Sequence, residues 1–145
     1  HSLDRRQRQM CIRDSLCRLN VDTKKLTWAG AMNPLWIVRK ESNKIEELKP
    51  DRQAIGMVEK PKLFTNQEIQ LSVDDSVYLF SDGFQDQFGG DQLKKYMRGK
   101  MKKFVLSIQN LSMQEQLSSF DKEFNSWKAK QEQVDDVCVM GVRIT

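Results

Sequence analysis

The residues best suited to chemistry in this sequence are aspartates next to apolar segments. Asp82 follows the run VYLFS and precedes Gly83, and Asp135 and Asp136 immediately precede the run VCVM. Carboxylates held at strand ends by rigid backbone are a usual way to bind a hard cation, and Mg²⁺ or Mn²⁺ would suit such an all-oxygen site where zinc would not. Gly83 would let a ligand or water approach the backbone beside Asp82.

These aspartates also have an ordinary structural interpretation. Asp-Gly after a strand is a common turn, and Asp-Asp before a strand is a common cap, so spacing alone leaves both interpretations open. Asp86 is a weaker candidate, for a role outside the metal ligands, and Asp74 and Asp75 are predicted to form a solvated hairpin turn. The carboxylates that matter most are therefore those of Asp82 and Asp135.

The histidine and cysteine content disfavours several other chemistries. His1 is the single histidine and lies at the very terminus, so a Ser–His or Cys–His pair would need a base from another chain. Cys11, Cys17 and Cys138 form no CxxC pair, which argues against a zinc site and against a disulfide framework. This cysteine usage fits a reducing compartment, and we expect a cytoplasmic location.

The elements that must position these residues are strands first and helices later. After Gly89 and Gly90 the apolar period changes from two to 3.6, which predicts helices at 91–108 and 112–130, the second opened by a capping box of Ser112 and Glu115. This order indicates an α+β fold, with helices packed against largely antiparallel sheet. Strands are predicted at 16–21, 26–28, 35–38, 44–48, 69–73, 77–80 and 137–144, with a hairpin turn at 22–25 and a loop at 50–61.

Composition is that of an ordinary globular chain. Its 145 residues, 39% hydrophobic and 30% charged, allow one domain with a core. The net charge is +4, of which residues 1–15 supply +2, and the remaining +2 is too weak to indicate nucleic-acid binding. No apolar run approaches the roughly 20 residues that span a membrane, so we expect no membrane contact by this segment.

The first fifteen residues do not match the pattern of the rest. Residues 9–15, QMCIRDS, resemble one reading frame through a transposon-end sequencing adapter. We therefore interpret residues 1–15 as a non-native, adapter-derived segment and leave them out of the fold argument. A natural basic arm is the alternative.

Three blocks, in order, resemble the SpoIIE-like metal-dependent serine/threonine protein phosphatases. Residues 28–35, WAGAMNPL, look like the AGxNP segment of that family. Residues 78–84, YLFSDGF, with 86–90, DQFGG, resemble its SDG motif and the flap that follows. Residues 133–137, QVDDV, are similar to its terminal DD block, and the resemblance covers residues 16–145.

The resemblance implies a fold, a reaction and a set of site residues. The fold would be the αββα sandwich of the PPM superfamily, and the reaction the hydrolysis of phosphoserine and phosphothreonine in proteins with two Mn²⁺ or Mg²⁺ ions. A water or hydroxide bridging the metals would attack phosphorus directly. By motif, Asp82 and Asp135 would be metal ligands and catalytic residues. Other motif positions would support the ligands or shape the loops: Asp136, Gly83, Gly30 and Asn33.

The sequence also departs from that family. Its amino-terminal half carries another acidic block and an Asp-Gly pair whose Asp bridges the metals, and nothing in residues 1–30 matches either. We therefore interpret residues 16–145 as the carboxy-terminal part of a phosphatase domain whose amino-terminal half is missing. Such a fragment is expected to bind metal poorly, to be inactive by itself and to expose one face of its sheets.

Partners and alternatives follow from the same resemblance. It implies a phosphoprotein substrate and, in a full-length parent that could be membrane-anchored, attached sensor domains, with the two long helices as a place for regulation by analogy. A non-catalytic phosphatase-like regulatory or binding module remains the main alternative. A receiver-like Mg²⁺-dependent domain is disfavoured, because it needs parallel strands alternating with helices.

Overall fold

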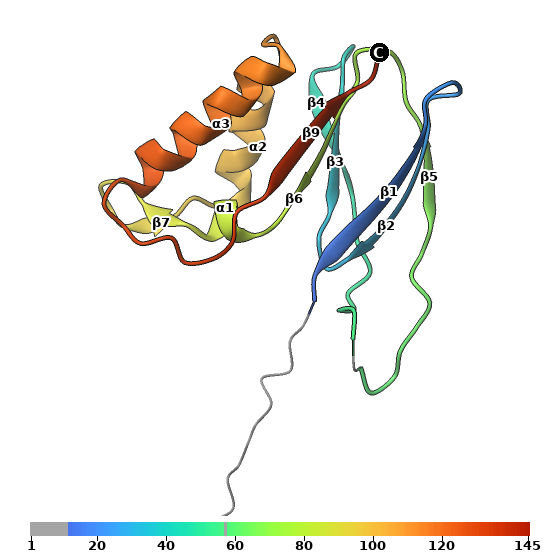
Figure 1. Ribbon diagram of the computed structural model, residues 1–145, viewed down its shortest axis with the longest axis horizontal. Coiled ribbons are helices and arrows are strands. Elements are labelled where there is room, and N and C mark those ends of the chain that lie inside the picture. Colours follow the sequence, from blue (N-terminus) through green and yellow to red (C-terminus); the bar gives the residue numbers. More distant parts are fainter. Residues whose placement is uncertain (1–11, 57) are drawn as a thin grey trace, which may run out of the picture.

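The chain folds into three layers, with helices on one side of two stacked β-sheets (Figure 1). A computed structural model describes residues 12–56 and 58–145. The elements in chain order are β1 (Asp14–Asn20), β2 (Lys25–Ala31), β3 (Leu35–Arg39), β4 (Lys44–Leu48), β5 (Gln67–Gln70), β6 (Ser76–Phe80), α1 (Gly83–Asp86), β7 (Phe88–Gly89), β8 (Lys94–Lys95), α2 (Arg98–Ser107), α3 (Met113–Lys128) and β9 (Val139–Arg143).

Both sheets are antiparallel throughout. The outer sheet has strand order β1-β2-β5, the middle sheet has order β4-β3-β6-β9, and β7 pairs with β8 in a separate two-stranded ribbon. The turn between β1 and β2 is closed by the side chain of Asn20, which accepts hydrogen bonds from the amides of Asp22 (3.1 Å) and Thr23 (3.0 Å). The predicted α+β class and the antiparallel sheets are confirmed, and a receiver-like fold is excluded.

Strand β3, in the interior of the middle sheet, is buried on both faces, which explains its unbroken apolar run. Leu35 and Ile37 face the outer sheet and pack with Trp28, whereas Trp36 and Val38 face the helices. The first four side chains of β3, those of residues 35–38, are at most 2% exposed. A strand covered on both sides needs apolar residues at every position rather than at alternate ones.

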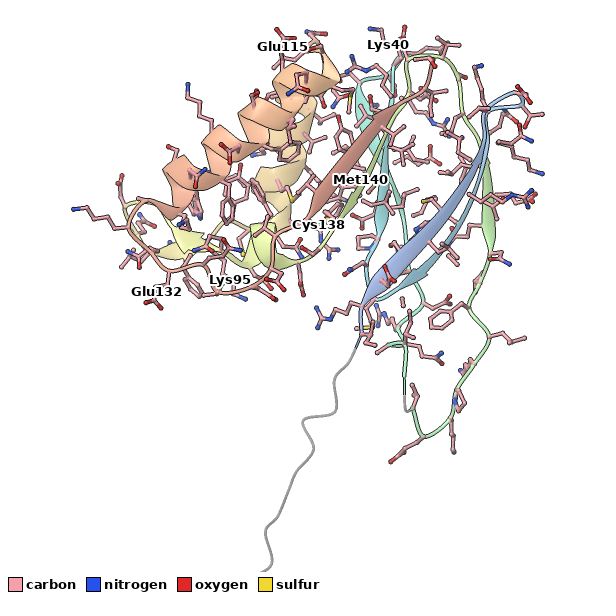
Figure 2. All side chains as sticks on the ribbon, viewed as in Figure 1. Lys40, Lys95, Glu115, Glu132, Cys138 and Met140 are labelled. Atoms are coloured by element: carbon pink, nitrogen blue, oxygen red, sulfur yellow. The ribbon has the colours of Figure 1, made fainter. Side chains whose placement is uncertain are left out.

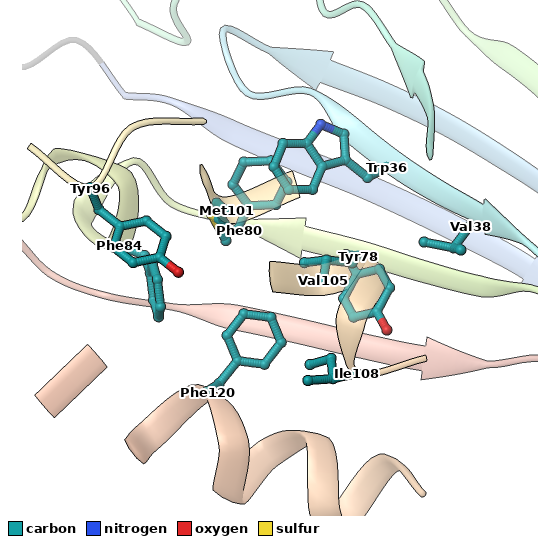
Figure 3. Packing of buried hydrophobic residues seen from close by; sticks show 10 residues of the cluster. All are labelled: Trp36, Val38, Tyr78, Phe80, Phe84, Tyr96, Met101, Val105, Ile108 and Phe120. Atoms are coloured by element: carbon teal, nitrogen blue, oxygen red, sulfur yellow. The ribbon is translucent and has the colours of Figure 1, made fainter. Parts of the chain in front are cut away.

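The helical layer packs on the middle sheet through an aromatic core (Figure 3). Phe80 stacks at 4.2 Å between ring centroids against Trp36, and Phe120 of α3 reaches Tyr78 at 6.5 Å. Aromatic pairs in such tilted arrangements contribute about 0.5–1.5 kcal/mol beyond their area burial. The core members are Trp36, Val38, Tyr78, Phe80, Phe84, Tyr96, Met101, Val105, Ile108 and Phe120.

Local signals in the sequence set the helix ends. The predicted capping box opens α3, because the Ser112 hydroxyl accepts from the Glu115 amide while the Glu115 carboxylate accepts from the Ser112 amide. Glu47 of β4 anchors α2 through Lys102 at 2.9 Å, and the same carboxylate accepts from the Trp36 indole at 2.7 Å. Among the described residues, 12–56 and 58–145, no helix is long and apolar enough to cross a membrane.

Three sequence predictions about elements were wrong in part. The helix predicted at 91–108 begins only at Arg98, because residues 88–95 form the β7–β8 ribbon instead. The link through Asp74 and Asp75 is no hairpin, since it joins strands of different sheets, and Asp75 is only 2% exposed. The last strand, predicted at 137–144, is limited to Val139–Arg143; it lies at the edge of the middle sheet, and Met140 there is 56% exposed.

Candidate functional site

The loop that carries Asp82 is held by a short helix. Helix α1 begins at Gly83, directly after Asp82, and the amide of Asp86 donates to the carbonyl oxygen of Asp82 at 3.0 Å. Phe84 is 1% exposed and meets the Tyr96 ring edge-on at 5.0 Å between centroids. Burying a phenylalanine contributes about 2 to 3 kcal/mol, which fixes α1, and Asp82 with it, against the helical layer.

The Asp82 carboxylate is partly exposed and already faces a positive charge. Its side chain is 22% exposed and forms an ion pair with the guanidinium of Arg13, which lies 69 residues earlier in the chain. The Asp82 carboxylate is therefore accessible, and a cation fits beside it.

Ser81 joins the Asp82 loop to the segment that carries Asp135 and Asp136. Beyond the last β6–β9 pair, the Ser81 amide donates to the Cys138 carbonyl oxygen at 2.9 Å. The Ser81 hydroxyl donates to the Asp136 carbonyl oxygen at 2.8 Å and accepts from the Cys138 amide at 3.0 Å. Figure 1 shows this segment passing directly beside α1. The structure thus brings the two predicted acidic segments together at one end of the middle sheet.

Gly83 is required by that close approach. A Cβ atom at Gly83 would lie 2.2 Å from the carbonyl oxygen of Asp136, a distance at which the backbone would have to move. The space beside Gly83 is therefore filled by the chain itself, where the sequence analysis expected an approaching ligand or water. The glycine allows the two acidic segments to pack in contact.

The carboxylates of Asp135 and Asp136 lie at the surface. Both residues are exposed, and the Asp135 carboxylate accepts a hydrogen bond from the Asp136 amide at 2.8 Å. The side-chain Nε2 of Gln133 donates to the carbonyl oxygen of Asp135 at 2.9 Å. This leaves most of the hydrogen-bonding capacity of the Asp135 carboxylate open to solvent.

Gly30 and Asn33 lie close to this end of the sandwich. A Cβ at Gly30 would lie 2.2 Å from the Trp28 ring and 2.7 Å from the Asn33 carbonyl oxygen, so only glycine fits there. Asn33 lines a cavity of about 420 Å³ whose wall also includes Arg13, Ser81 and Cys138. Gly30 thus shapes the loop after β2, and Asn33 shares a hollow with the residue that precedes Asp82.

The chemistry of these donors fits a hard divalent cation. Asp82, Asp135 and Asp136 offer only carboxylate oxygens, which suit Mg²⁺ or Mn²⁺ rather than zinc. Across residues 12–56 and 58–145, no three His, Cys, Asp or Glu side chains are grouped closely enough to hold a metal ion. Within the described residues, Asp82, Asp135 and Asp136 therefore do not by themselves form a complete metal-binding group.

Sequence reasoning missed two residues at this site. Arg13 falls in the segment set aside as non-native; of that segment, residues 1–11 lie outside the described residues, whereas Asp14 and Ser15 already pair in β1. Gln87, fully buried beside the segment that leads to Asp135, carries no chemical signal of its own. Both contacts join residues more than 40 positions apart, and no local pattern could have indicated them.

Comparison with known proteins identifies a family and a fold. The family model described as Stage II sporulation protein E (SpoIIE) matches residues 2–145. A search of curated proteins finds no match.

Solved phosphatase domains share the fold. The SiaA-PP2C domain of Pseudomonas aeruginosa superposes with a TM-score of 0.82 at 24% identity, covering 92% of this chain and 52% of that one. A structure of the SpoIIE PP2C phosphatase domain with a fragment of its regulatory domain, from Bacillus subtilis, gives 0.68 at 18% identity over 90% of this chain and 37% of that one. The RsbU and RsbW domains of a Mycobacterium tuberculosis protein give 0.68 at 15% identity over 90% and 35%. This chain thus spans 52% of the SiaA domain, and 37% and 35% of the other two chains.

Proposed function

This chain belongs to the SpoIIE family, and from that membership we propose that it carries part of the active site of a metal-dependent protein phosphatase. The observation that carries the proposal is the pairing of Ser81 with Cys138, which places the loop of Asp82 beside the segment of Asp135. Two carboxylate-bearing segments, 53 residues apart in numbering, are built into one end of a rigid sheet.

In this proposal the chain contributes two metal ligands. Asp82 and Asp135 bind the metal directly, and Asp136 supports Asp135 from the next position. Gly83, Gly30 and Asn33 shape the surrounding loops. The chain spans about half of the SiaA domain that it matches. The proposal assigns the remaining ligands to the part of such a domain that this chain does not cover.

Asp82 and Asp135 would hold the cations, which when bound would lower the pKa of a water toward neutral pH and offer positive charge to the phosphoryl oxygens. The Asp82 carboxylate is fixed by α1, and the Asp135 carboxylate by a backbone joined to Ser81. This reaction needs no side chain as a covalent nucleophile. A Ser or Cys nucleophile would need a histidine as its base, and His1 is the single histidine of the sequence.

We propose a phosphoserine or phosphothreonine protein as the substrate. Residues 94–103 hold six Lys or Arg and no Asp or Glu, so this segment carries +6 while the rest of the chain carries −2. It is tied to α1 by Lys95, whose ammonium lies 3.1 Å from the Asp86 carboxylate, and by Arg98, which donates to Gln85 at 3.3 Å. A basic surface next to the site suits a phosphorylated, acidic partner.

The arrangement of the parent protein extends the same proposal. One matched structure contains a regulatory-domain fragment beside the SpoIIE phosphatase domain of Bacillus subtilis. We place this domain likewise in a larger protein, in which a sensor domain controls the site.

A second candidate function rests on the ion pair at Asp82. Because Arg13 already neutralises this carboxylate, and because the described part of the chain holds no group of three acidic, His or Cys ligands, a phosphatase-like binding module without activity is the alternative. In that case the basic segment 94–103 would bind a partner, and Mn²⁺ would have no effect on it.

The test is the variant Asp82→Asn in a complete phosphatase domain that contains this chain. Loss of a metal ligand removes several kcal/mol of transition-state stabilisation, so we expect Mn²⁺-dependent release of phosphate from a phosphoprotein to fall about 1000-fold. Asp91→Asn makes the same chemical change at an exposed position of the β7–β8 turn and serves as the control. Hydrolysis by Asp82→Asn at the rate of the control would rule out the assignment.

A further inference from the structure

Gln87 is a fully buried polar residue whose side chain makes its bonds to the segment before Asp135. Its side-chain nitrogen donates to the carbonyl oxygen of Glu132 at 2.8 Å and to that of Phe88 at 3.0 Å. Its side-chain oxygen accepts from the Val134 amide at 3.4 Å. At 0% exposure, these groups have no access to water that could replace the bonds.

The backbone of Gln87 is fixed from two other directions. Its carbonyl oxygen accepts from the Tyr96 amide and from the Trp127 indole nitrogen, both at 3.0 Å. Trp127 near the end of α3 packs so closely on the ribbon that a Cβ at Gly89 would lie 1.9 Å from its carbonyl oxygen. The side chain of Gln87 therefore extends from a position that Tyr96, directly after β8, and Trp127 of α3 hold in place.

The segment that Gln87 contacts has no regular structure to hold it. Residues 131–136 are exposed and form neither helix nor strand. Figure 2 shows Glu132 on this loop, below the helical layer, and Cys138 farther along the chain toward β9. The loop is attached at two places: to Gln87 through Glu132 and Val134, and to Ser81 through Asp136 and Cys138. Asp135 lies between the two attachments.

We propose that Gln87 is a positioning residue that holds Asp135 where it can bind metal, an inference that rests on the proposed function. Ser81 fixes the loop on one side of Asp135 and Gln87 fixes it on the other. Residues that orient metal ligands in this indirect way typically change metal affinity 10- to 100-fold when they are replaced. Through Trp127, the same bonds join the end of α3 to the acidic loop.

A matched control exists in the same molecule. Gln116 is equally buried, at 2% exposure, but its side chain bonds the Tyr78 hydroxyl at 2.6 Å and the Leu111 carbonyl oxygen at 3.3 Å, within the helical core. Gln87→Met and Gln116→Met each remove one buried amide while nearly conserving volume. A merely structural role for Gln87 predicts that the two variants behave alike.

The first measurement is hydrogen exchange on the full 145-residue chain without metal. We expect Gln87→Met to speed exchange of the peptide covering 131–136 roughly tenfold, because the Val134 amide loses its acceptor and the loop loses an attachment. Gln116→Met should leave that peptide unchanged, and thermal unfolding of both variants checks that they fold. Unchanged exchange of the loop in folded Gln87→Met would overturn the inference. If Gln87→Met does not fold, Gln87→Glu takes its place, because it keeps the volume and the acceptor but cannot donate to both the Glu132 and the Phe88 carbonyl oxygens in either protonation state.

The second measurement is line broadening of amide signals by Mn²⁺ in the same chain, with Mg²⁺ as the diamagnetic reference. We expect broadening at Gly83 and Asp136 and a roughly tenfold higher Mn²⁺ concentration for half of that effect in Gln87→Met, but not in Gln116→Met. If Asp135→Asn weakens the broadening and Gln87→Met does not, the positioning role is wrong and the proposed metal site stands. If Asp135→Asn itself has no effect, the metal site is wrong, and the inference fails with it.

Discussion

An aspartate lies just beyond each end of strand β6, and the two carboxylates differ in burial and in the number of donors that they contact. Asp75 precedes the strand and is 2% exposed; it accepts from the Ser72 amide (2.9 Å), the Lys40 amide (3.0 Å) and the Arg39 guanidinium (2.9 Å). Asp82 follows the strand, is partly exposed and, among residues 12–56 and 58–145, has one charged partner, Arg13. Figure 2 shows the two ends well separated, with Lys40 at one and Cys138 at the other.

The difference separates a structural carboxylate from one that is open to a ligand. Burial alone would raise the pKa of Asp75, but the Ser72 and Lys40 amides and the Arg39 guanidinium outweigh burial and lower its pKa. Its oxygens have their donors within the fold. Within the described residues, the carboxylates at the opposite end, of Asp82, Asp135 and Asp136, have few partners, which is the condition expected of groups that bind something else.

The largest effect should come from the structural end. Asp75→Asn places an amide nitrogen where backbone amides and a guanidinium already donate, and removes the buried ion pair, so we expect it to destabilise the chain by about 3 kcal/mol in urea unfolding. Asp74→Asn makes the same change at the adjacent exposed residue, where asparagine tolerates the positive φ of 67°, and should stay within about 0.5 kcal/mol. Equal stability of the two variants would contradict the contrast.

The contribution of Asp75 should also depend on pH. Because its native pKa is lowered relative to the unfolded value of about 3.9, the unfolded chain binds the proton more readily, and the stabilisation is present above roughly pH 4. It is lost as the pH falls through the native pKa. The difference in free energy of unfolding between the unsubstituted chain and Asp75→Asn should therefore stay constant from about pH 5 to about pH 7. It should become smaller below about pH 4. A difference in unfolding free energy that grows as the pH falls would contradict a lowered pKa of Asp75 in the native state.

A smaller effect should distinguish the two neighbours at the open end. If Asp135 is the ligand and Asp136 supports it, Asp135→Asn should weaken Mn²⁺ broadening of the Gly83 amide roughly 100-fold and Asp136→Asn roughly tenfold. Neither variant should change unfolding by more than about 0.5 kcal/mol, because both side chains are exposed. The reverse order of affinities would exchange the two roles.

The same comparison shows what the sequence could and could not predict. It predicted the strand between Asp75 and Asp82, because the four apolar residues in a row at 77–80 indicate a buried strand, and the observed strand is Ser76–Phe80. It did not predict that the aspartate before that strand is buried and the one after it open. Burial of Asp75 depends on Arg39, which lies 36 positions away, and no periodicity encodes a contact at that separation.

The helical region gives a second case. The start of α3 was predicted correctly, because the capping box of Ser112 and Glu115 is a local signal within four residues. The start of α2 was predicted seven residues too early, because the β7–β8 ribbon before it is held by contacts with distant residues, such as the bond from the Gly90 amide to the Trp127 carbonyl oxygen at 3.1 Å. The roles of Asp82 and Asp135 stay predictions, although the structure brings their segments together as expected.

A weaker effect is expected on the basic surface beside the open end. In a complete domain, Lys94→Glu reverses one charge of the segment 94–103 and should raise KM for a phosphoprotein about three- to fivefold at low salt, with kcat unchanged. Lys122→Glu makes the same change in net charge on α3 and should leave KM as it is. The difference should shrink as salt is added, because exposed charges are screened. An equal rise in KM for a small aryl phosphate would show instead that Lys94 affects the site itself.

The smallest effect concerns the ion pair at Asp82. An exposed pair of this kind is worth about 0.2–1 kcal/mol, so Arg13→Gln should lower the Mn²⁺ concentration needed to broaden the Gly83 amide only about two- to threefold. Arg18→Gln removes the same charge from the outer face of β1 and controls for net charge. Arg13 also belongs to the segment 1–15 that the sequence predicts to be non-native, so a gain in affinity would mean that this segment competes with metal at the open end. A loss of Mn²⁺ affinity would mean instead that Arg13 helps to hold Asp82 in place. The Asp82 carboxylate would then have a structural partner, as Asp75 has, and the difference between the two ends of β6 would not hold.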